Sequence, residues 1–407
     1  MKLFKTIGKA LLALAVVLLA ATSCSENDTE GVKAHALTIR LTAGDLSADK
    51  LSDLKVIVSN NTKSDTLILG NTLTITKTYT QGSYNVFVSG KVSDEATAYV
   101  QGSAMVDLFD TKATTITLAK YNQSPLVFKT IYNTGGAKYY LLDGFVEIAN
   151  NSDEVQYLDG LLLAAPLANL KAQSAWQKEY PDFYHEGGQL NGVVLAFPGS
   201  GQDYPLLPGQ SVVVADQAMN HQLAYGSDES KKEEFAKTAN LSAANFEKYY
   251  GNGDTDNEEV PNMVVVSMRS GSKQKAFVTG VNGRAFMLIK LPQGMTHAAF
   301  MADANNFTTM PGTTAATPYM KIPHKYVLDA VDVYASTVAV TDHYPFFQDH
   351  DDATGIQGSP SYKGKCIRRK VSKLANGRPY YQDTNNSAND FKNNQDNTPG
   401  VTPTTAD

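Results

Sequence analysis

Apolar and polar residues alternate along residues 36–120, which is the pattern of β-strands with one buried face. Leu37, Ile39 and Leu41 share one face of the first such segment, and further segments repeat the pattern as far as residue 118. Short polar turns separate the segments. Roughly six or seven short strands in this arrangement predict a small antiparallel β-sandwich. We therefore place a first domain at residues 36–120.

The start of the chain has a different pattern, a continuous apolar run that follows three lysines. Lys2, Lys5 and Lys9 precede residues 10–23, which contain no charged residue. The run is shorter than the roughly 20 apolar residues that span a bilayer, and its position after lysines is typical of a secretory signal peptide. A buried core helix is the alternative, but such a helix would need one polar face. We expect residues 1–23 to be a signal peptide.

The apolar run ends in Ala21-Thr22-Ser23-Cys24, which resembles the lipobox of bacterial lipoproteins, although Ala21 stands where that motif usually has Leu. The resemblance implies that Cys24 is acylated (palmitate is the usual kind of chain) and becomes the new N-terminus. Several acyl chains on one residue bury enough methylene groups for a stable membrane anchor.

The tether at residues 24–35 carries three acids, Glu26, Asp28 and Glu30, close behind the cysteine. This acidic segment resembles the export signal that sends lipoproteins of Bacteroidota to the outer cell surface. It implies an outer-membrane protein that is lipid-anchored and exposed on the cell surface. The alternative is an ordinary polar tether, which any lipoprotein would have.

A second, larger unit follows at residues 121–392. Its clearest segment is the strand Phe145-Val146-Glu147-Ile148-Ala149-Asn150, which leads through a polar turn into a second strand. A later apolar strand, residues 207–215, opens with Leu207-Pro208-Gly209. These segments resemble the lamin-tail domain, which implies an immunoglobulin-like sandwich with no catalytic residues.

The whole chain resembles an uncharacterised family of Bacteroidota lipoproteins, chiefly at residues 325–333 and 383–391. The resemblance implies a prealbumin-like β-module followed by a lamin-tail-like domain. We therefore expect a mainly β protein with two antiparallel β-sandwich domains, the second lamin-tail-like with helical and loop insertions. The family has no settled biochemical role, so the resemblance implies a location and a fold.

Two insertions and the C-terminal tail interrupt the strand pattern. Residues 166–206 are rich in Tyr, Gly and Pro. Residues 217–262 contain the best helical stretches, at 228–237 and at 243–250, where Ser242 is a suitable N-cap. Residues 393–407 are mostly Asn, Asp, Thr and Pro, a composition that predicts a disordered tail.

Composition and charge exclude several classes of function. The chain has 407 residues, and its 35 Lys+Arg against 41 Asp+Glu argue against a nucleic-acid binder. Its two cysteines cannot build a disulfide framework or a Cys-rich metal site. No phosphate-binding loop or dinucleotide fingerprint is present, and the residues around Ser200 do not form a nucleophile elbow. We therefore expect that the protein is not an enzyme.

Aromatic residues in the predicted loops are candidate ligand contacts. We select Trp176, Tyr184, Tyr204, Tyr344 and Phe346, because loop aromatics often anchor a bound partner. The alternative is that these rings pack onto the sandwich and hold the long loops in place.

Two acidic loops are candidate cation sites. Asp254 and Asp256 lie in a segment of four acids and an amide, and His343, Asp349, His350 and Asp352 lie in a second segment that also contains Pro345. Oxygen ligands suit Ca²⁺, whereas mixed imidazole and carboxylate ligands suit a transition metal. The alternative for both segments is a solvated loop. We therefore expect no cofactor and keep a divalent cation as the alternative.

These observations predict a non-enzymatic outer-membrane surface lipoprotein that binds a ligand or partner. It would be accessory to a TonB-dependent outer-membrane transporter. A structural or adhesion protein is the alternative, and a secreted hydrolase without a recognisable motif is a third hypothesis. A pocket between the insertions favours capture, a flat apolar patch favours adhesion, and a convergent His/Asp/Ser cluster in a cleft favours hydrolysis.

Overall fold

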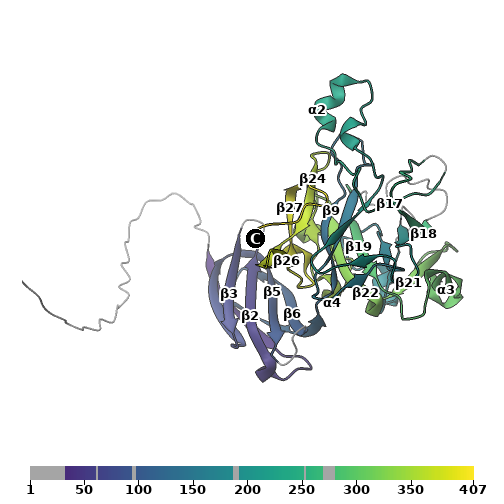
Figure 1. Ribbon diagram of the computed structural model, residues 1–407. Helices are drawn as coiled ribbons and strands as arrows, with labels where there is room; N and C mark the ends of the chain where they lie inside the picture. Colours follow the sequence, from purple (N-terminus) through teal and green to yellow (C-terminus); the bar gives the residue numbers. More distant parts are fainter. Residues whose placement is uncertain (1–32, 61–62, 94–97, 187–191, 252–253, 269–279) are drawn as a thin grey trace, which may run out of the picture.

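The computed structural model of the protein describes residues 33–60, 63–93, 98–186, 192–251, 254–268 and 280–407. The chain is mainly β and forms several sheets, as the strand patterns predict (Figure 1). The expected signal peptide and Cys24 lie outside the described residues. Within the described ranges, no helix is long and apolar enough to cross a membrane.

The N-terminal part builds two sheets, drawn in purple and blue in Figure 1. The three-stranded sheet has the order β4-β1-β7 and the five-stranded sheet the order β3-β2-β5-β6-β8. The elements are β1 (Ala34–Thr42), η1 (Ala48–Lys50), β2 (Leu51–Ser59), β3 (Ser64–Gly70), β4 (Thr74–Thr80), β5 (Gly82–Val92), β6 (Ala98–Leu108), β7 (Lys112–Thr117) and β8 (Ala119–Asn122).

These two sheets share one hydrophobic core, to which Leu37 and Ile39 of β1 and Val56 of β2 contribute. The alternating pattern therefore identified the buried faces correctly. The sheets are not purely antiparallel, however, because β1 pairs antiparallel with β4 and parallel with β7. The strand before β7 in sequence, β6, belongs to the other sheet, so no tight hairpin fixes the direction of β7.

A twelve-stranded sheet dominates the rest of the chain, in the order β23-β22-β19-β12-β14-β18-β17-β16-β10-β9-β24-β27. Its strands are β9 (Leu126–Tyr132), β10 (Phe145–Asn150), β12 (Leu162–Ala164), β14 (Val193–Ala196), β16 (Ser211–Ala215), β17 (Phe246–Lys248), β18 (Asn262–Met268), β19 (Arg284–Ile289), β22 (Val327–Tyr334), β23 (Ile356–Gln357), β24 (Lys365–Arg369) and β27 (Phe391–Asp396).

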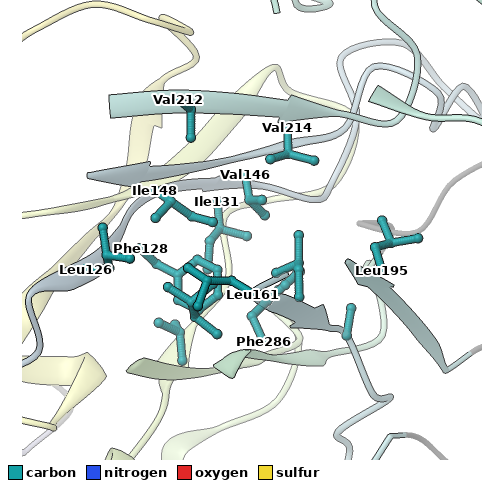
Figure 2. Packing of buried hydrophobic residues seen from close by; sticks show 14 of the residues in the cluster. Leu126, Phe128, Ile131, Val146, Ile148, Leu161, Leu195, Val212, Val214 and Phe286 are labelled. Carbon is teal, nitrogen blue, oxygen red and sulfur yellow. The ribbon is translucent and has the colours of Figure 1, made fainter. Parts of the chain in front are cut away.

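This sheet curls until its two outermost strands, β23 and β27, come into contact, and the side-chain amide of Asn393 donates to the carbonyl of Gln357 over 3.2 Å. Phe128, Ile148 and Phe286 point into its interior and pack with apolar residues from most of its strands (Figure 2). The pairs β16–β17, β17–β18 and β22–β23 are parallel. The second unit is thus built on one curled, mixed sheet instead of two separate antiparallel layers.

The remaining elements of this part of the chain are short. The short sheets are β11 (Gln156–Tyr157) with β15 (Pro205–Leu206), β13 (Phe183–His185) with β21 (Pro318–Pro323) and β20 (Phe307–Thr309), and β25 (Val371–Ala375) with β26 (Arg378–Tyr381). The helices are α1 (Ala175–Glu179), η2 (His221–Leu223), η3 (Glu229–Lys231), α2 (Lys232–Phe235), α3 (His297–Ala302), η4 (Ala304–Asn306), η5 (His324–Tyr326), η6 (Val340–Asp342), α4 (Asp349–Asp352) and α5 (Ser387–Asp390).

The insertion at 217–262 contains one helical stretch in the expected place and one strand where a helix was expected. Both η3 and α2 lie within the stretch 228–237. Residues 243–250 are not helical, because β17 pairs parallel with both β16 and β18. Glu247 of β17 is buried and accepts hydrogen bonds from the backbone N–H groups of Ala218 and Asn257. Tertiary pairing therefore outweighs the weak helical preference of this segment.

The prediction of a disordered tail at residues 393–407 is wrong. Residues 393–396 belong to β27, which pairs with β24. Further on, the Gly400 N–H donates to the Glu147 carboxylate over 2.6 Å, and the Val401 carbonyl accepts from Lys129 Nζ over 2.8 Å. The tail is ordered by polar contacts to a buried ion pair, which a composition poor in apolar residues does not reveal.

The outer face of the five-stranded sheet packs against the second unit. Phe87 and Gln101 lie on that face and are buried. The Gln101 side-chain amide donates to the backbone carbonyl of Asp349, the first residue of α4. Helix α4 also contacts β6 and β8. The short helix that carries the candidate site thus lies at the junction of the two units.

Candidate metal centre

His324, His350 and Asp351 are brought together by two segments that are distant in the sequence. His324 begins η5 directly after β21, and β21 is held in place by pairing with β13. The backbone N–H of His324 donates to the carbonyl of Asp182, next to β13, over 3.2 Å. Strand pairing therefore sets the position of the first imidazole.

His350 and Asp351 lie on α4, a single turn whose Asp351 and Asp352 N–H groups bond the carbonyl of Gln348. Asp352 is fully buried and holds this turn in place. Its carboxylate accepts from the backbone N–H of Asp332 over 2.8 Å, and from the N–H and hydroxyl of Ser387 over 2.8 and 2.6 Å. Asp352 therefore anchors the turn to β22 and α5.

The three side chains each offer one ligand atom, and these atoms all lie within 4.8 Å of one another. His350 Nε2 lies 3.4 Å from a carboxylate oxygen of Asp351, and the two imidazole centroids are 5.3 Å apart. Among the described residues, the buried Nε2 of His324 has no hydrogen-bond partner. A buried polar nitrogen without a partner is costly, and a metal ion at this position would satisfy it.

Tyr184 of β13 contacts both halves of the centre. Its ring stacks on His324 with centroids 4.1 Å apart, its hydroxyl donates to Asp351 over 2.6 Å, and the Gln348 N–H donates to that hydroxyl over 3.0 Å. These contacts fix the imidazole plane and the carboxylate orientation. Tyr184 is thus a positioning residue, since such outer contacts orient metal ligands.

The protonation states suit a cation. Burial, and after it the proximity of His350, lowers the pKa of His324 to about 4, so this imidazole is neutral at pH 7. Burial raises the pKa of the Asp351 carboxyl to about 6. A neutral imidazole and an ionised carboxylate are the forms in which these side chains bind metal ions.

The centre lies in a pocket of about 820 Å³. The His350 side chain is 43% exposed, so the centre is open to solvent on the side of this imidazole. Besides the three ligands, the charged lining residues are Lys120, Asp182 and Lys325, and the apolar lining residues include Phe183, Val327 and Leu328. The volume is within the range of small-molecule sites.

The aromatic residues predicted as ligand contacts lie mostly in the core. Trp176 is 2% exposed, its indole N–H donates to the carbonyl of Phe183 over 2.8 Å, and its ring meets Tyr180 and Tyr319. Tyr184 and Phe346 are buried, while Tyr204 and Tyr344 are half-buried. Tyr204 packs against Phe246. Their positions fit the alternative that these rings hold the loops in place.

The predicted cation ligands separate into several environments. Asp254 forms an ion pair with Lys248 over 3.1 Å, with both side chains fully buried, and Asp256 accepts from the Asn262 amide. His343 Nε2 lies 3.0 Å from an Asp332 carboxylate oxygen, also in the interior. Asp349 and Asp352 lie on α4 but outside the group of three ligand atoms. Of the six residues selected from the sequence, His350 alone belongs to that group.

Sequence reasoning missed His324 and did not select Asp351 from the segment that contains it. His324 follows Pro323 at the end of a strand, 26 positions before His350. No spacing motif connects them, because the contact is made by the β13–β21 pairing. The sequence offers only a weak indication that His324 has a special role. The chain has 7 histidines, and this one follows a proline at the end of a strand.

Residues 207–398 match the model of a family described as "Protein of unknown function (DUF4876)". The matched segment contains all three candidate ligands. Among solved structures, a DUF4876 family protein from Bacteroides thetaiotaomicron has a TM-score of 0.56 and 26% sequence identity, over 91% of this chain and 99% of that one. A DUF3823 family protein from Parabacteroides merdae reaches a TM-score of 0.18 at 10% identity, over 35% of this chain and 69% of that one, which supports no conclusion. No curated protein matches the chain.

Proposed function

We propose that this chain, related to the DUF4876 family over residues 207–398, is a non-enzymatic lipoprotein of the outer cell surface that binds a divalent transition-metal ion. The observation that carries the metal proposal is the buried, unpartnered Nε2 of His324 beside His350 and Asp351, within the described part of the chain. Two imidazoles and one carboxylate form a ligand set that suits Zn²⁺ and neighbouring transition metals.

The metal proposal is tested by titrating the full mature chain in detergent with Zn²⁺ and following the heat of binding. We expect one equivalent to bind, and we expect His350→Ala to weaken binding by at least about tenfold, because one of three protein ligands is lost. His350 is exposed, so this variant should keep its fold. His297→Ala, on α3 and away from the pocket, is the matched control. Binding that is equal in His350→Ala and wild type would overturn the proposal.

The anchor is supported by the signal peptide, the lipobox-like segment and Cys24. We expect Cys24→Ala to release the protein from the membrane fraction, because the proposal attaches the protein through acyl chains on this residue. Acyl labelling that persists in this variant would refute the assignment. Protease added to intact cells should digest the wild-type protein, and full protection would place it on the periplasmic face.

The proposed partner is a TonB-dependent outer-membrane transporter, to which the lipoprotein would pass its metal. The lipobox-like segment before Cys24 and the exposed imidazole of His350 support this role. The neighbouring genes test it: a transporter gene beside this one is expected, and its consistent absence from related genomes would argue for adhesion instead.

We infer that the second unit is a modified lamin-tail domain and the first a prealbumin-like module. In support, the two segments that carry the lamin-tail resemblance lie side by side, since Phe145 of β10 pairs with Ala215 of β16. A structural superposition of strands β9, β10 and β16 on a lamin-tail domain with matched connections is expected. A different strand order would contradict it.

A further inference from the structure

We infer that the metal-loaded pocket binds an organic carboxylate, with one oxygen on the metal and the negative charge facing Lys120 and Lys325. This inference rests on the proposed metal function and names the ligand class of the same site. It follows from the number of metal ligands, the charge of the pocket and the nature of its walls.

The number of protein ligands leaves room on the metal. Described residues supply three ligand atoms, from His324, His350 and Asp351. A transition metal of this type takes at least four ligands, and a site with three protein ligands keeps a position for water or an external ligand. Because the pocket of about 820 Å³ adjoins these atoms, the open position can receive a group much larger than water.

The charge of the pocket favours an anion once the metal is present. Two lysines, Lys120 and Lys325, and two carboxylates, Asp182 and Asp351, line the pocket, so the formal charges of these four side chains sum to zero. A divalent ion therefore gives the pocket an excess of positive charge, which a ligand carboxylate reduces. Lys325 is exposed in η5, beside His324, and its ammonium nitrogen lies over the ring of Tyr326, another lining residue, 5.5 Å from the ring centroid.

The walls favour an organic anion over inorganic phosphate. Phe183, Val327 and Leu328 are half-buried and add apolar surface to the lining of the pocket, which also contains the charged groups. A ligand with a carboxylate and an apolar body matches both surfaces, since small-molecule sites combine apolar walls with a few directing polar groups. Phosphate would leave the apolar wall in contact with water.

The pocket also joins the two units of the chain. Lys120 comes from β8, which pairs with β6 of the N-terminal sheet, whereas the metal ligands come from the second unit. The Gln101–Asp349 hydrogen bond spans the same junction. A bound carboxylate would therefore contact groups from both units.

The test uses the full mature chain loaded with Co²⁺, whose visible absorption changes when its ligands change. Benzoate is the probe, and acetate and inorganic phosphate are the comparisons. We expect a saturable spectral change with benzoate, at a lower concentration than with acetate or phosphate. Lys120→Ala and Lys325→Ala should each weaken benzoate binding roughly two- to fivefold, the effect of one exposed charge. Lys171→Ala, outside the pocket, should leave it unchanged.

The outcomes separate this inference from the proposed function. If Co²⁺ binds and benzoate leaves the spectrum unchanged, the carboxylate inference is wrong and the metal function stands. Tighter binding of phosphate than of benzoate, or lysine variants that bind like the wild type, would also overturn the inference. If Co²⁺ and Zn²⁺ both fail to bind, the metal function and this inference fall together.

Discussion

The single tryptophan is a stabilising core residue at the base of an insertion. Trp176 packs among Tyr180, Tyr319 and His185. Its indole N–H donates a hydrogen bond to the carbonyl of Phe183. We expect Trp176→Ala to lower the free energy of unfolding by roughly 3–5 kcal/mol, the usual cost of removing a large buried ring. Urea unfolding followed by far-ultraviolet circular dichroism measures the change. Leu223→Ala, at an exposed position, should stay within about 0.5 kcal/mol of the wild type.

The buried His221 predicts an acid-sensitive stability. Its Nδ1 lies 2.6 Å from the Tyr140 hydroxyl, its Nε2 lies 3.0 Å from the Gln217 carbonyl, and burial lowers its pKa from 6.5 to about 4. Above pH 6.5 neither state carries this proton. Between about pH 6.5 and 4 only the unfolded chain binds this proton. The equilibrium constant for unfolding should therefore rise about tenfold for each unit by which the pH falls in this range.

We therefore expect the loss of stability between pH 7 and 5 to be smaller in His221→Gln than in the wild type. Urea midpoints at pH 7, 6 and 5 give the comparison, with His297→Gln as the control. The same pH slope in wild type and His221→Gln would show that another group is responsible.

In the candidate metal centre, the sequence indicates a ligand that has other ligand-type residues close by in the chain, and it does not indicate residues that come from a distant segment. His350 was selected because several ligand-type residues lie close together in the chain. His324 and Tyr184 reach it through the pairing of β21 with β13, which brings residues 184 and 322 opposite each other. A contact between segments so far apart depends on sheet register, and no local pattern records it.

At the level of elements, period-two alternation predicted the strands of the N-terminal unit well, because each of those strands has one buried and one outward face. It failed for β17, whose residues Phe246, Glu247 and Lys248 are all buried. A three-residue strand with both faces covered has no alternation, and Ser242 nearby suggested a helix start. The prediction for the tail failed because the order of the tail depends on hydrogen bonds to Glu147 and Lys129, which no local pattern shows.

The tail predicts the effect of truncation. Lys129 and Glu147 are buried 3.2 Å apart, and the tail supplies each of them with a backbone partner. A chain that ends after residue 397 loses both partners, and each lost hydrogen bond to a charged group costs about 1.5–3 kcal/mol. A chain that ends after residue 403 keeps both. We expect the shorter chain to melt at a clearly lower temperature than the longer one, and equal melting temperatures would contradict this account.

At the scale of the whole molecule, the two units differ in how their cores are built. Every residue in the core of the N-terminal unit lies between Leu37 and Leu118. The large curled sheet instead draws its core from residues 126 to 391. The first unit therefore closes its core within a continuous segment, whereas the second needs nearly all the remaining chain. This difference explains why local patterns described the first unit better.

Independent folding of the first unit is the prediction that follows. Residues 33–122 should give a dispersed NMR spectrum when produced alone, because none of their core contacts is lost. Phe87 and Gln101 would become exposed, but they lie on the outer face and belong to the junction. Val56→Asp, which places a charge in the core, should abolish the dispersion. An undispersed spectrum of the wild-type segment would mean that the junction is required for folding.

In the full chain we expect two heat-absorption peaks, because the two units have separate hydrophobic cores. Added Zn²⁺ should raise the temperature of the peak that belongs to the second unit, because a ligand stabilises only the structure that binds it. The first peak should move little, since the group of three metal ligands contains no residue from the N-terminal sheets. Gln101→Ala, which removes the contact to Asp349, should separate the peaks further by weakening the junction. A single peak that shifts as a whole with Zn²⁺ would instead show that the two units unfold together.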